Sequence, residues 1–254
     1  MVQRARFLAV ALLACLALAG TASAVDYGDF MDPTGTVAYN NVSDVNGLFG
    51  APSVSLNSLD FTPTGFQALC STGLGCPGAA STSDMLTLDI QAVAGQQITE
   101  ITITEGLDYQ LQAFGTGAFA SVTVVANVFI DIFEINGVSV NDISQAFSLS
   151  YDPANSFSVF GPTGIAGGLF SGELTVDIQS ILTANAVLGE ATGVRISFDN
   201  TLQAFHAGGG QALIRKRDAD FVSLTINGGN PVPEPGTALL VMGGLALLAG
   251  RRHS

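Results

Sequence analysis

His206 is the first residue to test for chemistry, because it is the only histidine between the two ends of the chain. A catalytic triad or a metal centre needs histidines or clustered ligands, and no His-Glu-x-x-His, Gly-x-Ser-x-Gly or Cys-x-x-Cys motif is present. His206 stands beside Gly208-Gly209-Gly210, a sequence typical of a loop. We therefore expect no catalytic residue, no metal-ligating residue and no cofactor.

Carboxylates are the other candidates. Asp131, Glu134, Asp177 and Asp199 lie in segments that alternate as strands do. Two carboxylates close together can hydrolyse a glycosidic bond, but spacing along the sequence does not bring any two of these together. Each is expected at an outward-facing strand position. The pairs Asp152/Asn155 and Asp199/Asn200 offer oxygen ligands for Ca²⁺, yet neither has EF-hand spacing.

The densest charge cluster is Arg215-Lys216-Arg217-Asp218-Ala219-Asp220. We favour a hairpin whose charges compensate one another, with Lys and Arg protecting an exposed sheet edge. The alternative is a small cationic patch that binds an acidic glycan.

Cys70 and Cys76 are the only cysteines after residue 24. The segment between them has the composition of a loop, and two nearby cysteines pair in an oxidising compartment. We predict a disulfide between them. A redox or zinc role would need closer spacing or more ligands.

The whole chain has 254 residues, with 8 Lys and Arg against 21 Asp and Glu. Residues 25–230 keep four basic residues and 20 acids, a net charge of about −16, and are long enough for one sizeable core. An acidic surface repels phosphate backbones, which excludes nucleic-acid binding, and it disfavours anionic membrane surfaces. The acids are dispersed, which indicates a soluble, self-repelling surface.

Alternation of apolar and polar residues recurs through the middle of the chain, as in Leu86–Ala92, Leu174–Ile178 and Val194–Phe198. Asn136-Gly137 lies between two β-rich runs and predicts a tight hairpin, because the primed turn needs positive φ. The alternating residues should share one core; those expected to be buried are Leu88, Ile90, Ile103, Val176, Ile196 and Leu224.

Many short strands with turn signals between them predict an all-β domain over residues 25–226, a β-sandwich or jelly roll. Residues 25–83 are rich in Ser, Gly, Asn and Pro and should form short strands joined by long loops. Ser180–Gly189 is the one expected short helix.

Residues 1–24 have the order of a secretory signal peptide. Arg4 and Arg6 precede the apolar stretch Phe7–Gly20, and Ala22-Ser23-Ala24 has the small side chains that signal peptidase requires. The apolar stretch is shorter than the roughly 20 residues of a membrane span. We expect cleavage after Ala24, so that the mature chain begins at Val25. Cys15 lies in a weak lipobox, but the apolar stretch continues past it, which disfavours lipidation.

The C-terminal segment has three parts in order. Residues 227–236 form a linker that contains Pro233-Glu234-Pro235, residues 237–250 are apolar, and residues 251–254 begin with Arg251 and Arg252. A helix over the apolar part rises roughly 21 Å, less than the hydrocarbon core of about 30 Å, so it is a temporary span. The arginines should stay in the cytoplasm and the Pro-Glu-Pro segment on the periplasmic side.

This order resembles the PEP-CTERM family of sorting tails over roughly the last 23 residues, Val232 to Ser254. The resemblance implies that an exosortase recognises Pro233, Glu234 and Pro235 and that the tail is removed. It also implies association with exopolysaccharide in a Gram-negative bacterium. The expected processing partners are signal peptidase and this exosortase, and insertion in the inner membrane would be transient. An ordinary C-terminal anchor behind a Pro-rich linker is the alternative.

Two functional hypotheses follow. The first is a non-catalytic surface or matrix protein delivered by the sorting tail. The second is a polysaccharide-binding or polysaccharide-processing β-sandwich, which the absence of Trp and the presence of only four Tyr disfavour. A cluster of exposed aromatic residues, or a close carboxylate pair on one face, would favour the second hypothesis. A uniformly acidic surface without a pocket would favour the first.

Overall fold

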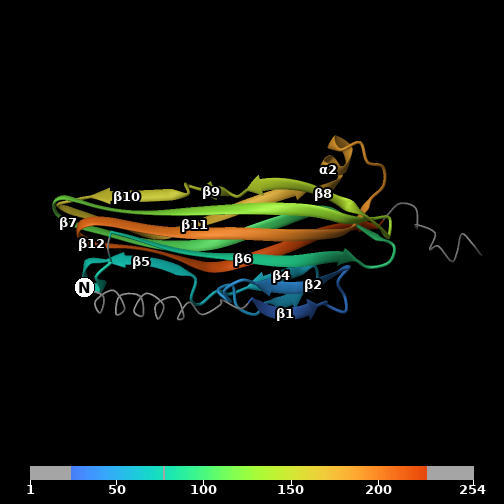
Figure 1. The fold of residues 1–254 in the computed structure, drawn as a ribbon, viewed down its shortest axis with the longest axis horizontal. Coiled ribbons are helices and arrows are strands. Elements are labelled where there is room, and N and C mark those ends of the chain that lie inside the picture. The colour runs from blue at the N-terminus through green and yellow to red at the C-terminus, as the bar shows by residue number, and fades with distance from the viewer. Residues whose placement is uncertain (1–23, 77, 228–254) are drawn as a thin grey trace, which may run out of the picture.

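The computed structural model describes residues 24–76 and 78–227, with side chains up to Phe221. These residues form 12 strands, a short 3-10 helix and one α-helix (Figure 1). The elements are β1 (Val25–Phe30), β2 (Val37–Asp44), β3 (Ser53–Ser55), β4 (Ser58–Phe61), β5 (Gln67–Ser71), η1 (Thr72–Leu74), β6 (Ala79–Ala92), β7 (Gln96–Ile135), β8 (Val138–Ser148), β9 (Ser150–Asp152), β10 (Ser156–Phe160), β11 (Thr163–Asp177), α2 (Ile178–Ala184) and β12 (Ala191–Asn227).

Two long strands, β7 and β12, organise the fold. They pair antiparallel along almost their whole length, and both double back at the same end of the molecule (Figure 1). Phe198 and Phe221 belong to β12, yet their ring centroids are 5.7 Å apart. A straight strand would separate these residues by roughly 75 Å. Each long strand therefore consists of two segments, which we call arms, and contributes one arm to each of two facing layers.

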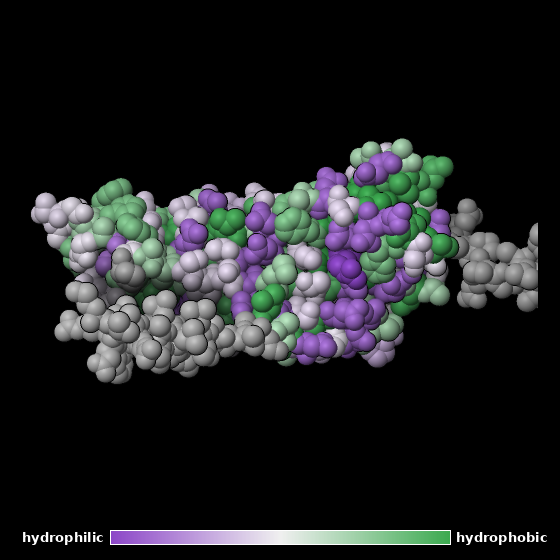
Figure 2. Space-filling model, in the orientation of Figure 1, coloured by the Kyte–Doolittle hydropathy of each residue, from purple (hydrophilic) through white to green (hydrophobic). Residues whose placement is uncertain are grey.

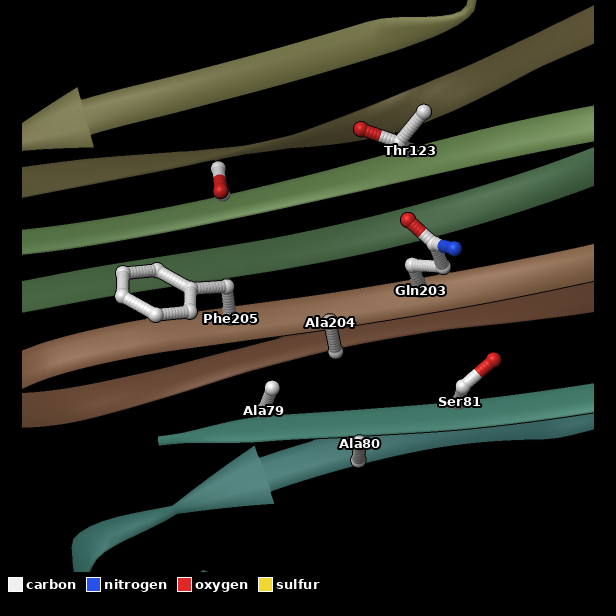
Figure 3. A pocket seen from close by; sticks show the side chains of 8 residues that line it. Ala79, Ala80, Ser81, Thr123, Gln203, Ala204 and Phe205 are labelled. Carbon is white, nitrogen blue, oxygen red and sulfur yellow. The ribbon is translucent and has the colours of Figure 1, made fainter. Parts of the chain in front are cut away.

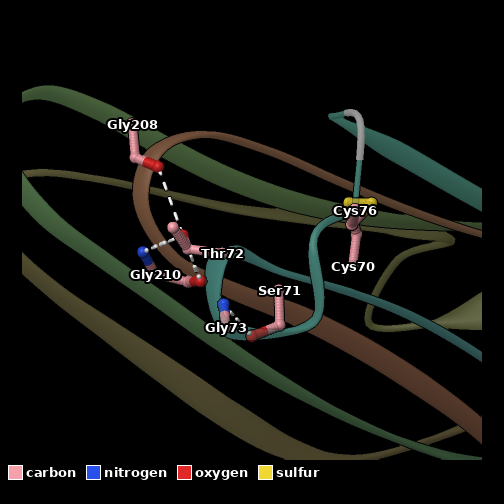
Figure 4. The surroundings of a disulfide bond; sticks show 7 residues. All are labelled: Cys70, Ser71, Thr72, Gly73, Cys76, Gly208 and Gly210. Carbon is pink, nitrogen blue, oxygen red and sulfur yellow. Dashed lines mark hydrogen bonds between the residues drawn. A yellow bond between two sulfur atoms is a disulfide. The ribbon is translucent and has the colours of Figure 1, made fainter.

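Glycines make these bends possible. Gly115 and Gly117 in β7 and Gly208 and Gly210 in β12 all have positive φ. A Cβ atom on Gly210 would lie 2.0 Å from the backbone oxygen of Gln112, so β12 and β7 approach too closely there for a side chain. The hydroxyl group of Thr72 holds the bend of β12, because it donates to Gly210 O (3.1 Å) and accepts from Gly210 N (3.2 Å) (Figure 4).

The register of the pairings assigns the strands to two layers. The first sheet contains β1, β2, β6, residues 191–207 of β12, residues 119–135 of β7, and then β8 and β10. The second sheet contains β4 and β5 beside residues 209–227 of β12, then residues 96–114 of β7, β11 and β9, with β3 beyond β4. The predicted β-sandwich is confirmed.

The core lies between these sheets, where the alternation placed it. Leu88, Ile90, Ile103 and Ile196 are fully buried and Val176 is 2% exposed, which confirms five of the six predicted positions. The sixth, Leu224, lies beyond the last described side chain.

The smaller elements largely match expectation. Asn136 (φ 50°) and Gly137 (φ 74°) join β7 to β8 as a tight hairpin, and residues 25–83 contain the expected short strands. The predicted helix bounds, Ser180–Gly189, are wrong, since α2 spans Ile178–Ala184. It starts earlier because Asp177 caps it, accepting a hydrogen bond of 3.0 Å from Ser180 N.

The two expected processing segments fall largely outside the description. Strand β1 begins at Val25, the first residue after the expected cleavage site, and pairs with β2, whereas Ala22 and residues 233–252 lie outside the described residues. Within residues 24–76 and 78–227, none of the helices has the length and apolar character needed to cross a membrane.

Candidate functional site

The charge cluster at residues 215–220 is not a hairpin, so that prediction is wrong. It lies inside β12, where successive side chains point to opposite faces. Arg215 and Arg217 point outward and share one carboxylate, that of Asp108 in β7, at 2.7 and 3.0 Å, so the partner of these two charges lies outside the cluster. Lys216 points into the core and is 2% exposed.

Lys216 belongs to a closed polar cluster between the sheets. Its Nζ donates to Glu105, and that carboxylate also accepts from Asn200 Nδ2 (2.6 Å) and from the hydroxyl group of Tyr151. Burial lowers the pKa of Lys216, and the negative charge of Glu105 opposes this shift. The side chains of Lys216 and Glu105 have no exposed surface. This cluster therefore holds the two sheets together rather than meeting a ligand.

The four carboxylates singled out in the sequence remain apart in the sheet register. Asp131 lies opposite Arg195, and Asp199 lies opposite Asn127. Glu134 accepts hydrogen bonds of 2.7 Å from Gln91 and from Thr192. Asp177 ends β11 and caps α2 instead of occupying an ordinary outward strand position.

Two acids that the sequence did not single out are deeply buried. Asp44 accepts from the backbone N–H groups of residues 47 and 49, and Asp84 from those of residues 46 and 48, all between 2.7 and 3.0 Å. Burial raises the pKa of Asp44, and neighbouring Asp84 adds to the increase. These acids fix the turn after β2. Asn200 points inward to Glu105, so it does not share an outward Ca²⁺ site with its strand neighbour Asp199.

The predicted disulfide between Cys70 and Cys76 is present, with a Cα–Cα separation of 5.3 Å (Figure 4). His206 is not the loop residue that the adjacent glycines indicated. It lies within β12, is 7% exposed, and has a ring nitrogen within 4.8 Å of both sulfur atoms.

A groove lies on the outer face of the first sheet, across β6, β12 and β7 (Figure 3). Its volume is about 390 Å³. The side chains of Ser81, Thr123, Gln203 and Phe205 project from the strands into it. The complete lining is Ala79, Ala80, Ser81, Ser121, Thr123, Gln203, Ala204 and Phe205, so hydroxyl and amide groups face one aromatic ring and no charged residue takes part.

Three phenylalanines extend this groove toward the bend; we call them the aromatic cluster, Phe119, Phe160 and Phe205. The ring centroid of Phe119 is 4.9 Å from that of Phe160 and 5.8 Å from that of Phe205. Phe160 is 70% exposed and Phe205 is 42% exposed. Apolar side chains gather at this left-hand end of the face (Figure 2).

The sequence contained a signal for the cluster. Phe119 stands between Ala118 and Ala120, both buried, so period-two alternation directs its ring outward. Adjacency of the three rings depends on strand register, which pairs Phe160 with Phe119. That register does not follow from any single segment.

Comparisons with known proteins identify no family. No family model matches the chain, and no curated protein matches it. Among solved structures, the active domain of tailspike protein 4 of bacteriophage CBA120 has a TM-score of 0.22 and 11% identity over 81% of this chain, which spans 20% of that longer protein. A carbohydrate-binding module specific for non-crystalline cellulose, CBM28, gives a TM-score of 0.18 and 13% identity over 55% of this chain and 74% of its own. A Cel12A cellulase derived from that of Rhodothermus marinus gives a TM-score of 0.22 and 14% identity over 80% of this chain and 100% of its own.

Proposed function

We propose that this chain is an exported, surface-sorted protein without catalytic activity, and that it binds a neutral polysaccharide on the outer face of its first sheet. The observation that carries the proposal is the exposed aromatic cluster beside a groove lined by uncharged polar groups. It is the feature that distinguishes a glycan-binding sandwich from a uniformly acidic surface protein.

The chemistry of a sugar chain fits this arrangement. Pyranose rings present faces of C–H groups that pack on aromatic rings, and hydroxyl groups that exchange hydrogen bonds with amide and hydroxyl side chains. Phe160 and Phe205 would supply the apolar contact, and Ser81, Thr123 and Gln203 the polar contacts. The net charge of the whole chain is −13, which opposes an acidic glycan and favours a neutral one.

Binding rather than hydrolysis is the activity that the groove supports. Hydrolysis of a glycosidic bond needs a pair of carboxyl groups, and the lining residues of the groove include none. Export and sorting are supported by the signal-peptide pattern and by the resemblance of residues 232–254 to PEP-CTERM tails.

Phe205→Ala and Phe160→Ala test the groove. We expect the exported wild type to be retarded in native gels that contain neutral exopolysaccharide of the host, and each variant to bind about tenfold more weakly, as expected for loss of a central aromatic contact. Leu169→Ala is the matched control, because Leu169 is 76% exposed on β11 in the second sheet. Failure of the wild type to bind any neutral polysaccharide, or equal weakening by Leu169→Ala, would refute the proposal.

A further inference from the structure

Three side chains from separate parts of the chain meet inside the bend of the sandwich. Cys70 lies at the end of β5 in the second sheet, where it pairs with Ala212, and it is fully buried. Cys76 follows η1 and is partly exposed. His206 comes from the facing arm of β12 in the first sheet, where it pairs with Ala120. The sulfur atoms and a ring nitrogen all lie within 4.8 Å of one another.

Within the described part of the chain, the imidazole ring of His206 makes no hydrogen bond that explains its burial. The residue is 7% exposed, and among the described residues neither ring nitrogen has a hydrogen-bond partner. A buried polar group without a partner costs free energy, so such a group in a folded protein calls for an explanation. One of the ring nitrogens of His206 lies near the two sulfur atoms, and sulfur is a poor hydrogen-bond acceptor but a good co-ligand for a metal.

The three ligand atoms lie close enough together to approach a metal site, since all are within 4.8 Å of one another. Zinc binds thiolate sulfur at about 2.3 Å and imidazole nitrogen at about 2.0–2.1 Å, so two ligands of one ion lie at most about 4.6 Å apart. The two sulfur atoms have only to separate from their mutual bond to reach such a geometry. Cys70 and His206 lie on strands of the two sheets, so the sandwich holds these two ligands near each other without the metal, and Cys76 lies in the segment after η1.

We propose that Cys70, Cys76 and His206 form a Zn²⁺ site when the disulfide is reduced, with water in the fourth position. A phosphine reductant cleaves the S–S bond, takes the oxygen atom of a water molecule and becomes a phosphine oxide, and each sulfur gains a proton. Zn²⁺ then replaces these two protons and accepts one electron pair from each thiolate and one from the imidazole. The two cysteines therefore have two alternative states, one bonded as a disulfide and one bound to Zn²⁺ with His206. The partly exposed Cys76 gives the ion access to the site.

This inference does not depend on glycan binding. It extends the expectation drawn from the sequence, in which two cysteines lacked further ligands, because the fold supplies the third ligand from β12. Acidic side chains on the surface can bind Zn²⁺ weakly. The amount of Zn²⁺ bound by the oxidised chain is therefore the background against which binding by the reduced chain is compared.

The test is zinc binding by the exported full chain, oxidised or treated with a phosphine, measured by equilibrium dialysis with zinc chloride. We expect the reduced wild type to bind one more Zn²⁺ per chain than the oxidised wild type. His206→Gln should weaken that extra site by at least about tenfold, since even a residue outside the ligand shell contributes that much. Cobalt should give a thiolate-to-metal absorption band in the reduced wild type and a weaker one in the variant.

Circular dichroism of the same samples controls for folding. Equal zinc binding by reduced and oxidised chains would overturn the proposal, as would full-strength binding by His206→Gln. A reduced chain that unfolds and is not refolded by zinc would also overturn it, because the sheets then do not hold the ligands. Cys70→Ser, which keeps a side chain of similar size, should lose both the disulfide and the extra zinc.

Discussion

Lys216 is a charged side chain inside an apolar core, and its contacts explain how the fold tolerates it. Its Nζ lies 4.9 Å from the ring centroid of Phe198, 5.2 Å from that of Phe49 and 5.5 Å from that of Phe66. Glu105 supplies the opposite charge. A buried ion pair is weak evidence of net stabilisation, but removal of one partner leaves an uncompensated charge.

Lys216→Met should therefore destabilise the chain by about 3–5 kcal/mol, because Glu105 would remain buried without its cation. The double variant Lys216→Met/Glu105→Gln should recover much of that loss, since the remaining amide carries no charge. Urea denaturation of the wild type, the two single variants and the double variant measures the coupling. A loss below about 1 kcal/mol in Lys216→Met would show that Glu105 is not buried as described.

Tyr27 gives the fold a dependence on alkaline pH. Burial, with the nearby charge of Asp44, raises the pKa of its phenol group to about 12, from a usual value of 10.0. Between these values the unfolded chain loses the proton first, so the folded state binds more protons and its free energy of unfolding falls as pH rises. We expect the stability of Tyr27→Phe to decline less than that of the wild type from pH 10 to about 12, in denaturant titrations at each pH. Parallel declines would contradict this assignment.

The alternation of apolar and polar residues predicted which side chains of some strands point into the core. Applied to other strands, it would also have predicted the inward direction of two charged side chains. Ile101, Ile103 and Glu105 share one face of β7, so the alternation that correctly buried Ile103 also directs Glu105 inward. The same rule directs Lys216 inward with Ile214. We interpreted residues 215–220 by their charge and not by the alternation of the strand, and that interpretation wrongly predicted a hairpin. The meeting of His206 with the cysteines depends on contact across the sheets, which no local pattern contains.

At the scale of elements, local turn chemistry was predictable and the long strands were not. Asn136-Gly137 requires positive φ at both residues, so its hairpin follows from two neighbouring positions. The alternation is also broken by the glycines of the bends, Gly115, Gly117, Gly208 and Gly210. A turn signal, however, does not tell whether a strand ends there or bends and continues in the facing sheet. The bends coincide because β7 and β12 are paired, a fact that belongs to both strands together.

Gly210→Ala tests the bend directly. The new Cβ atom would meet the backbone oxygen of Gln112 at 2.0 Å, at a residue whose φ is +135°. Gly95→Ala is the matched control, because Gly95 also has positive φ (+81°) but nothing lies within 4 Å of its added Cβ. We expect Gly95→Ala to cost about 1–2 kcal/mol from backbone strain alone and Gly210→Ala clearly more, by urea denaturation. Equal losses would mean that β12 and β7 do not approach closely at Gln112.

At the scale of the whole molecule, an acidic surface contrasts with an uncharged region formed by the groove and the aromatic cluster. The 21 acids of the chain outnumber its 8 basic residues, while the groove and the aromatic cluster carry no charge. An uncharged strip on an acidic, self-repelling protein favours a neutral ligand over a second copy of the same chain. The strands β6, β7 and β12 that form this strip also carry core residues, so the proposed binding face belongs to the packed part of the sandwich.

The last prediction concerns how the sandwich reaches its place of action. Strand β12 ends at Asn227, the first residue of the expected linker. Beyond it, Pro233 and Pro235 cannot donate backbone hydrogen bonds to a sheet, which suits an extended segment that a processing enzyme grips. Arg251 and Arg252 would hold the end of the tail in the cytoplasm. Glu234→Ala should therefore block processing and leave the full-length chain in the inner membrane.

Glu173→Ala is the matched control, since it removes an exposed acid from β11 without touching the tail. In a host that contains an exosortase, membrane fractionation should find the wild type and Glu173→Ala released, and Glu234→Ala retained with its disulfide intact. A host without the enzyme should retain all three, because the apolar segment, although shorter than the bilayer core, keeps each chain inserted until it is cut. Release of Glu234→Ala at the wild-type rate would show that processing does not depend on the Pro-Glu-Pro segment, and retention of every chain in both hosts would make the tail an ordinary anchor. Either result would contradict the assignment of the tail as a sorting signal.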